Sequence, residues 1–429
     1  MAEWRRVGRL LTIAAALPTL AAGCGGTDST LVRPSSVSGL PGGFSLELNR
    51  NAQAFVQDQV WTEGRTQYAV WVNASGSAAV GKRTLPRGGW STYDLGRLRG
   101  NPLALPTRLD EHNVYAVAVD DRGYVHVAGN MHGDPIRWVR SLRPGDITRW
   151  TPRGMPAGEP TTTYPRFVRT RSGELLFFFR SGDSGDGDLA LRRWYGRERR
   201  WGRTTTVIDG RSSGESPYPQ HIATDRRRRV HVMYTWRARP DPATTGDLSY
   251  AVSPDAGRRW RTSTGAKLPV PITHARSEII LATKPGGPRL SNAGGLDIDS
   301  AGTPHAGILV GGRLHHVWRE GRRWRIETAP TPRPPVTRPA VFAGSAGDIF
   351  LLTTSPQRRG QSTVWAVGVA GDAGRSQRPV KLRDIGAAQS EVTYDTRGAS
   401  LDGRLRLLLP GRQAPSGGEV VEYEPTAIR

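Results

Sequence analysis

The body of the chain consists of short apolar runs separated by turn-forming residues. Residues 114–119 (VYAVAV), 124–127 (YVHV) and 175–179 (LLFFF) are examples, and Gly, Asp or Ser bound them. Runs of this length, rich in β-branched and aromatic residues, predict strands. No long stretch repeats its apolar positions every 3.6 residues, and Gly supplies 52 and Pro 32 of the 429 residues, which disfavours helices. The pattern predicts an all-β fold.

The runs recur with a regular spacing. A turn cassette of Asp or Ser, mostly followed by Gly, appears at residues 119–123, 170–173, 223–225, 298–302 and 346–348. Tryptophans at 90, 150, 201, 260 and 324 follow the same series, with separations of 60, 51, 59 and 64 residues. A spacing of about 55 residues fits about seven four-stranded units into the chain. Radial stacking would cover the apolar face that each unit leaves open. We therefore expect a seven-bladed β-propeller of four-stranded antiparallel blades over residues 46–428.

One repeat is sharper than the others. Residues 253–260, Ser-Pro-Asp-Ala-Gly-Arg-Arg-Trp, resemble the Asp-box, or BNR repeat, of sialidase-like propellers. The resemblance implies that Ser253 and Asp255 close a tight turn through backbone hydrogen bonds and that Trp260 fills the gap between blades. We expect this motif to be structural, to lie away from the active face, and to place the fold in the sialidase-like superfamily.

The first 23 residues predict an export signal. A basic start precedes 13 apolar residues at 10–22, too few to span a bilayer but typical of a signal peptide. The segment ends in Leu-Ala-Ala-Gly-Cys, which resembles the bacterial lipobox with Ala in place of the usual Leu. Cys24 is the only cysteine, which excludes disulfides; a spare buried cysteine is the alternative. We expect lipid on Cys24, a flexible tether over residues 24–45, and anchoring on the outer side of the bacterial cytoplasmic membrane.

Charge restricts the partners. The formal net charge is +22 and the isoelectric point about 11.1, so the protein's field attracts polyanions. An exported protein rarely meets nucleic acid, so an acidic polysaccharide is the expected partner. The run Arg226 to Arg229 is expected to form a solvated hairpin tip. The sequence gives no sign of oligomerisation.

Two histidines, a tyrosine and an arginine stand out as candidate chemistry. His112 precedes His132 by 20 residues, and Tyr164 precedes Arg180 by 16. Each lies beside a predicted strand, and together they can supply a base, an acid and an anion clamp. Other histidines fit structural roles: His126 and His231 lie within strands. The adjacent His315 and His316 would point to opposite faces.

Over most of residues 50–410 the chain resembles the BNR-repeat family that contains the propeller-type ulvan lyases. The similar elements are Asp110-Glu111-His112-Asn113, Gly129-Asn130-Met131-His132, Tyr164-Pro165-Arg166-Phe167 and Arg180-Ser181-Gly182. The resemblance implies β-elimination in a uronic-acid chain. His112 would be the base, with His132 holding the sugar or sharing that role; Tyr164 would protonate the leaving oxygen, and Arg180 would neutralise the uronate. We expect the same pocket to be lined by Asn113, Arg166, Tyr218, Arg237 and Asn292, and the scheme requires no metal or other cofactor.

Two other functions stay open. A propeller with a basic, aromatic-lined face can bind a glycan, or a protein partner, without cutting anything. A sialidase-like glycoside hydrolase would need three arginines around a carboxylate and a Tyr–Glu nucleophile pair, which the sequence does not display.

Overall fold

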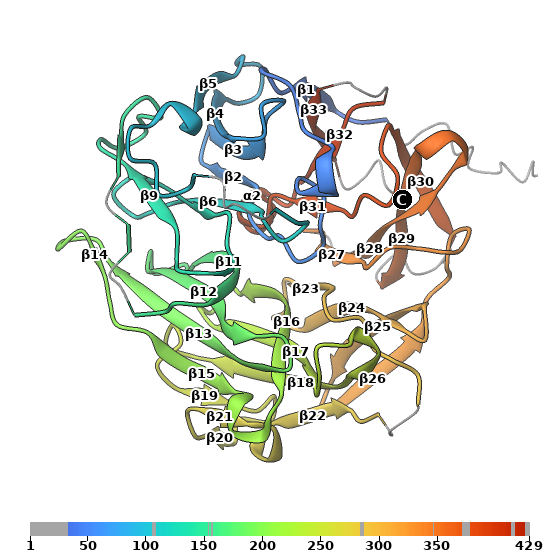
Figure 1. The fold of residues 1–429 in the computed structure, drawn as a ribbon. Helices are drawn as coiled ribbons and strands as arrows, with labels where there is room; N and C mark the ends of the chain where they lie inside the picture. Colours follow the sequence, from blue (N-terminus) through green and yellow to red (C-terminus); the bar gives the residue numbers. More distant parts are fainter. Residues whose placement is uncertain are drawn as a thin grey trace, which may run out of the picture.

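Strands dominate the structure and form seven sheets arranged around a common centre (Figure 1). The computed structural model describes residues 33–104, 109–152, 154–155, 158–283, 287–345, 347–370, 378–412 and 417–424. No helix within these ranges is long and apolar enough to cross a membrane. The expected signal peptide (residues 1–23) and Cys24 lie outside the described residues. The predicted all-β fold is confirmed.

Five sheets have four antiparallel strands, as predicted, and in four of the five the strands follow chain order or its reverse. They are β2 (Val60–Glu63), β3 (Thr66–Val72), β4 (Ala78–Thr84) and β5 (Ser91–Asp94); β6 (Tyr115–Val119), β7 (Val125–Gly129), β9 (Trp138–Ser141) and β10 (Trp150–Thr151); β23 (Gly295–Ile298), β24 (Pro304–Val310), β25 (Arg313–Glu320) and β26 (Arg323–Thr328); β27 (Ala340–Ala343), β28 (Ile349–Pro356), β29 (Ser362–Ala370) and β30 (Pro379–Ile385); and β31 (Thr393–Tyr394), β32 (Leu405–Pro410), β33 (Gly418–Tyr423) and β1 (Ser36–Gly39).

Two sheets are larger because short strands add to their edges and ends. The third sheet contains β11 (Thr162–Arg169), β12 (Leu175–Asp183), β13 (Asp186–Tyr195) and β15 (Thr205–Asp209), joined by β8 (His132–Asp134), β14 (Arg200–Trp201) and β21 (Ile272–Thr273). The fourth contains β16 (Ser216–Thr224), β17 (Val230–Arg237), β18 (Thr245–Ser253), β19 (Trp260–Arg261), β20 (Lys267–Leu268) and β22 (Glu278–Leu281). The single α-helix of the described residues, α2 (Thr396–Asp402), follows β31.

The ring has two distinct ends. The strands nearest its centre are β2, β6, β11, β16, β23, β27 and β31 (Figure 1). The loops that lead into these strands gather at one end, here called the site face, where Arg180 hydrogen bonds Tyr218 and Arg338 pairs with Glu391. The turns that follow them gather at the other end, here called the distal face, where Arg171 contacts the carbonyl of Ser400.

The first strand closes the ring with the last. Residues Ser36–Gly39 of β1 pair antiparallel with β33, with Ser36 opposite Glu422 and Gly39 opposite Glu419. The expected tether of residues 24–45 therefore overlaps the folded body, which begins about ten residues earlier than predicted from composition. A Gly- and Ser-rich segment can form an edge strand when a distant partner supplies the hydrogen bonds, and composition alone does not reveal that partner.

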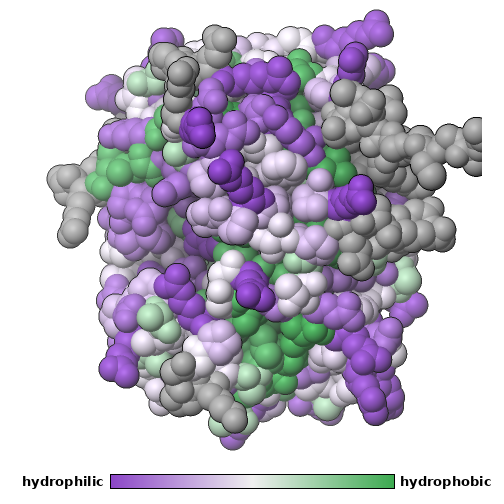
Figure 2. Space-filling view, turned by 90° about the vertical axis from the view of Figure 1, so that its right-hand side faces the viewer, coloured by the Kyte–Doolittle hydropathy of each residue, from purple (hydrophilic) through white to green (hydrophobic). Residues whose placement is uncertain are grey.

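The hydrophobic core lies between neighbouring sheets. One cluster joins Val80 of the first sheet, Val127 of the second and Phe177 of the third. All five residues of β6 are buried, so its apolar run does not alternate, because sheets pack against it from both sides. In the side view of Figure 2, hydrophilic residues cover much of the surface and hydrophobic ones show mainly in strips between them.

Turns on the distal face repeat one arrangement. The carboxylates of Asp120, Asp225 and Asp299 each accept a backbone N–H four residues later. Their second oxygens contact His126, His231 and His305. The predicted structural roles of His126 and His231 are thus confirmed.

The Asp-box turn has the geometry implied by its resemblance. Ser253 Oγ accepts from the backbone N–H of Gly257 at 2.7 Å, and Asp255 Oδ1 accepts from that of Arg259 at 2.8 Å. Trp260 is fully buried in a cluster built from the third and fourth sheets. This turn joins β18 to β19 on the distal face, and its contacts are structural.

Candidate active site

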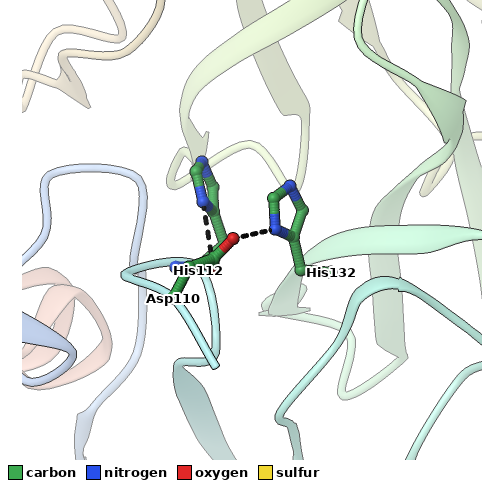
Figure 3. Close-up of side chains that lie close together, drawn as sticks. All are labelled: Asp110, His112 and His132. Carbon is green, nitrogen blue, oxygen red and sulfur yellow. Dashed lines mark hydrogen bonds and ion pairs between the residues drawn. The ribbon is translucent and has the colours of Figure 1, made fainter. Parts of the chain in front are cut away.

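Two imidazoles share one carboxylate on the site face (Figure 3). Asp110 and His112 lie in the loop before β6, and His132 begins β8. Asp110 Oδ1 lies 3.3 Å from Nδ1 of His112, and its Oδ2 forms a very short hydrogen bond with Nδ1 of His132. The two imidazole rings stack with centroids 4.1 Å apart. When both Nδ1 atoms donate to Asp110, each Nε2 is left as a proton acceptor.

Protonation follows from this packing. Phe55, before β2, stacks on the other side of His112 at 4.9 Å. Burial, followed by the neighbouring His132, lowers the pKa of His112 to about 4. Burial alone would raise the pKa of Asp110, but the backbone N–H of His112 and the His132 imidazole hold it below its usual range. His112 is therefore neutral, and Asp110 ionised, at neutral pH.

Tyr164 lies beside the imidazoles in a strained backbone conformation. Its φ of 61° is in the left-handed region, and the pairing of β11 with β12 shifts register between Thr163 and Arg166. This bulge turns the phenol toward His112, with ring centroids 5.6 Å apart. Strain of this kind often marks functional positions. Burial raises the pKa of Tyr164 despite the opposing charge of Arg180, and no described residue hydrogen bonds its hydroxyl.

Two buried guanidiniums converge on Tyr218. Arg180 donates to its hydroxyl at 2.9 Å and Arg237 at 3.1 Å. Ser184 Oγ lies 2.6 Å from the same hydroxyl. Among the described residues no carboxylate pairs with Arg180 or Arg237, and Nε of Arg180 and Nη2 of Arg237 are buried without partners. Two guanidiniums already donate to the Tyr218 hydroxyl, and Ser184 Oγ can accept the hydrogen bond that this hydroxyl donates, so Tyr164 is the phenol whose hydroxyl stays free of described partners.

Not every residue expected in the pocket lines it. Arg166 is 1% exposed and donates to the backbone carbonyl of Gln220 toward the centre of the ring. Asn113 is equally buried and accepts from the backbone N–H of Asp110 at 2.8 Å, so it shapes the loop that carries His112. Both side chains are held away from the candidate pocket by these hydrogen bonds, and for Arg166 the register shift between Thr163 and Arg166 changes the side on which the residues after Tyr164 lie.

Asn292 does reach the pocket, through a residue that the sequence analysis missed. Its Oδ1 accepts from Nη1 of Arg338 at 3.1 Å. Arg338 also forms a two-point ion pair with Glu391, with both N–O distances 2.6 Å, and its guanidinium lies 5.3 Å from the Phe55 ring centre. A cavity of about 240 Å³ is lined by Arg237, Asn292 and Arg338, among others.

The missed residues share one signal. Phe55, Arg338 and Glu391 all lie a few residues before the first strand of a sheet, the same position that His112 occupies before β6. Once the repeat was assigned, the segments that precede each innermost strand could have been searched for aromatic and charged residues. They carry no motif of their own, so local pattern did not single them out.

Three side chains of the site offer metal ligands. One ligand atom each from Asp110, His112 and His132 lies within 4.8 Å of the others. Imidazole and carboxylate donors in this number suit Zn²⁺ or a similar divalent ion with open positions. The same two histidines are the proposed proton acceptors of a metal-free reaction.

Comparison with known proteins shows which family this chain matches. Residues 66–330 match the family described as BNR repeat-containing family member. An ulvan lyase of Alteromonas sp. (strain LOR) is 24% identical over 288 residues, 54% of each chain. An ulvan lyase of Nonlabens ulvanivorans is 21% identical over 271 residues, 53% of this chain and 56% of the relative. The match thus spans about half the length of these curated relatives.

Solved structures extend the likeness in fold over nearly the whole chain. An ulvan lyase of polysaccharide lyase family PL25 superposes with a TM-score of 0.66 at 16% identity, covering 92% of this chain and 98% of the other. Polysaccharide lyase Uly1 gives 0.65 at 13% identity, covering 91% and 99%. The fold is therefore a β-propeller like that of these lyases. With more than half of its length matched by the family, the chain belongs to the BNR repeat-containing family.

Proposed function

We propose that this protein is a polysaccharide lyase that cleaves a uronic-acid polysaccharide by β-elimination. The observation that carries the proposal is the pair of buried guanidiniums, Arg180 and Arg237, that have no carboxylate partner among the described residues. Buried charges are normally paired, so a uronate carboxylate is a fitting counter-ion. The ulvan lyases among the relatives support the same reaction class.

The reaction divides among four side chains. His112 takes the proton from the sugar carbon next to the carboxylate, and the electrons of that C–H bond form a carbon–carbon double bond. The bond from the neighbouring carbon to the glycosidic oxygen breaks, and Tyr164 gives its proton to that oxygen. Arg180 offsets the charge that develops on the carboxylate. His132, hydrogen bonded to Asp110, holds the sugar or shares the proton with His112.

The protonation states suit these roles. Neutral His112, with a pKa of about 4, has a free lone pair, and binding of a uronate beside it raises its basicity because a nearby negative charge favours the imidazolium. Tyr164, whose pKa is raised, keeps its proton until the leaving oxygen accepts it. The base and the acid therefore start in the required states at neutral pH.

Further sugars have room beside the reacting one. The cavity lined by Arg237, Asn292 and Arg338 adjoins the guanidinium pair. A second cavity, of about 470 Å³, shares Thr245 and Arg289 with it and reaches Arg239. A chain of anionic sugars laid along both would meet one arginine after another, which fits a polymer better than a single sugar.

The proposal includes the architecture and the location of the protein. Each of the seven sheets would be one blade of a seven-bladed propeller, closed by β1 against β33. A signal peptide over residues 1–23 would direct export, and lipid on Cys24 would hold the protein on the outer side of the bacterial cytoplasmic membrane. The lipobox-like segment and the single cysteine support this.

Ultraviolet absorbance tests the reaction directly, because elimination leaves an unsaturated uronate. The full chain is incubated with ulvan and with other uronate polysaccharides, and absorbance is followed. A rise that disappears in His112→Ala and in Tyr164→Phe is expected. New reducing ends without absorbance would indicate a hydrolase instead.

A binding protein without catalysis is the second candidate. The same guanidiniums would hold an anionic glycan even if no bond breaks. Retention of the polysaccharide by the full chain in a gel, together with flat absorbance for every substrate, would favour this reading over the lyase.

A further inference from the structure

The distal face carries a surplus of exposed arginines. Twelve arginines on its turns are exposed and form no ion pair with a described carboxylate. They are Arg65, Arg87, Arg122, Arg143, Arg171, Arg197, Arg199, Arg226, Arg227, Arg228, Arg322 and Arg323. The predicted hairpin tip is among them, since residues 226–228 are exposed between β16 and β17.

Acidic residues on this face do not balance them. Glu174 pairs with Arg193 and Arg258, and Asp255 pairs with Arg259. The remaining carboxylates that bond a cationic side chain there include Glu63, Asp146, Glu198, Asp225, Glu320 and Asp402. Because most of the carboxylates are already neutralised locally, the unpaired arginines leave the distal face with a net positive field.

The chain also enters the ring at the distal face. Ser36 lies opposite Glu422, next to Tyr423, the last residue of β33. The backbone N–H of Ser35 bonds the carbonyl of Glu422 at 2.8 Å. Only 12 positions separate Cys24 from Ser36, which reach at most about 40 Å when fully extended. A lipid on Cys24 would therefore hold the distal face, and not the site face, toward the membrane.

We propose that the distal face docks on anionic phospholipid headgroups of the membrane to which the protein is attached. This inference rests on the proposed lipid anchor for orientation and on the described arginines for chemistry. A lipid chain with a basic patch is a stronger anchor than either alone, and each guanidinium near an anionic surface strengthens binding by about fivefold. The arrangement points the candidate active site away from the bilayer, toward polysaccharide in the surroundings.

Vesicle binding tests the docking surface. The full chain with Cys24→Ser, which removes the lipid, is mixed with phosphatidylcholine vesicles with and without phosphatidylglycerol, and the bound fraction is measured by sedimentation. Apolar residues at the N-terminus would bind both kinds of vesicle alike, so the readout is the ratio of the bound fractions with and without phosphatidylglycerol. The distal variant replaces Arg226, Arg227 and Arg228 by Gln.

A matched variant removes the same charge from the other end. Arg97, Arg99 and Arg313 are exposed on the site face and also lack ion pairs with described carboxylates, so their replacement by Gln controls for net charge. Thermal unfolding of both variants confirms that they fold.

Three outcomes decide the proposal. A preference for phosphatidylglycerol that weakens with salt, falls by about tenfold to a hundredfold in the distal variant and persists in the control would support it. Equal losses in both variants, or no preference in the unmutated chain, would overturn it. Loss of polysaccharide retention in the distal variant, with lipid preference intact, would assign the face to the glycan instead. Lyase activity on soluble substrate is measured separately, so the vesicle-binding results can be interpreted even if the catalytic proposal fails.

Discussion

Arginines stand out at both ends of the ring, but the ones that carry the two proposals differ in burial. On the site face, Arg180 and Arg237 are buried, held by hydroxyl groups, and have no carboxylate partner among the described residues. On the distal face, arginines such as Arg226 and Arg322 are exposed to solvent. Desolvation makes an unpaired buried cation costly, and this cost supports the proposed anionic ligand. An exposed cation costs little, and only the sum of many such charges has an effect.

The largest expected effect is a loss of catalytic rate when a reactive group of the site face is removed. His112→Ala or Tyr164→Phe is expected to lower kcat/KM for a uronate polysaccharide by about 10²- to 10⁴-fold, the usual contribution of a positioned base or acid. Initial rates of absorbance increase provide the measurement.

Matched residues elsewhere provide the control. His315→Ala, on β25, and Tyr195→Phe, 39% exposed near the distal face, remove the same groups and should leave the rate within a factor of about two. Comparable losses in both pairs would mean that His112 and Tyr164 have no special role in the reaction.

Ion pairs on the two faces should differ in their effect on stability. Glu391→Gln is expected to lower the free energy of unfolding by about 3 kcal/mol, because it leaves Arg338 largely buried without its partner. Glu320→Gln, which breaks the exposed contact with Arg325 on the distal face, should cost less than about 1 kcal/mol. Urea unfolding followed by tryptophan fluorescence compares the two variants, and equal costs would contradict the contrast.

Zinc should act on one face alone. Zn²⁺ coordinated by Asp110, His112 and His132 would put a divalent positive charge on the base and oppose its protonation, so added zinc is expected to inhibit, and a chelator to restore activity. The chelator alone should leave the rate unchanged. Asp110→Asn is expected to weaken zinc inhibition relative to its own zinc-free rate, and inhibition unaffected by this change would place the zinc elsewhere.

The smallest effect concerns pH. His112 must be neutral to accept a proton, and its pKa is lowered from 6.5 to about 4. As pH falls, kcat/KM should therefore persist through 6.5 and decline only toward about 4. The pH profile of kcat/KM reports the free enzyme, and an acid limb near 6.5 would contradict the lowered pKa of His112.

Local pattern was enough to predict much of this molecule. Short apolar runs and repeated Asp turns predicted strands in units of about 55 residues, and the Asp-box at 253–260 predicted a turn whose hydrogen bonds the structure contains. His112, His132, Tyr164 and Arg180 were singled out through their resemblance to a family and do converge. The strands, the turns and the identity of these four residues depend on short stretches of sequence, so the sequence carries them directly.

Contacts between distant segments of the chain could not be predicted from local sequence pattern. Three contacts join distant segments: the pairing of β1 with β33, the ion pair of Arg338 with Glu391 and the stacking of Phe55 on His112. The partners are 53 to more than 300 residues apart, and no sequence motif links them. The burial of Arg166 away from the pocket likewise depends on which way a bulged strand turns its side chains.

Sequence alone thus determined the all-β repeat, the turn chemistry and the candidate reactive groups, since each is encoded within a few neighbouring residues. Tertiary structure decided which of those groups meet, which arginines are buried, and that the chain enters the ring at the end opposite the candidate site. The physical reason is ring closure: stacking the sheets brings loops from every part of the chain to one end, and it sends their connecting turns to the other.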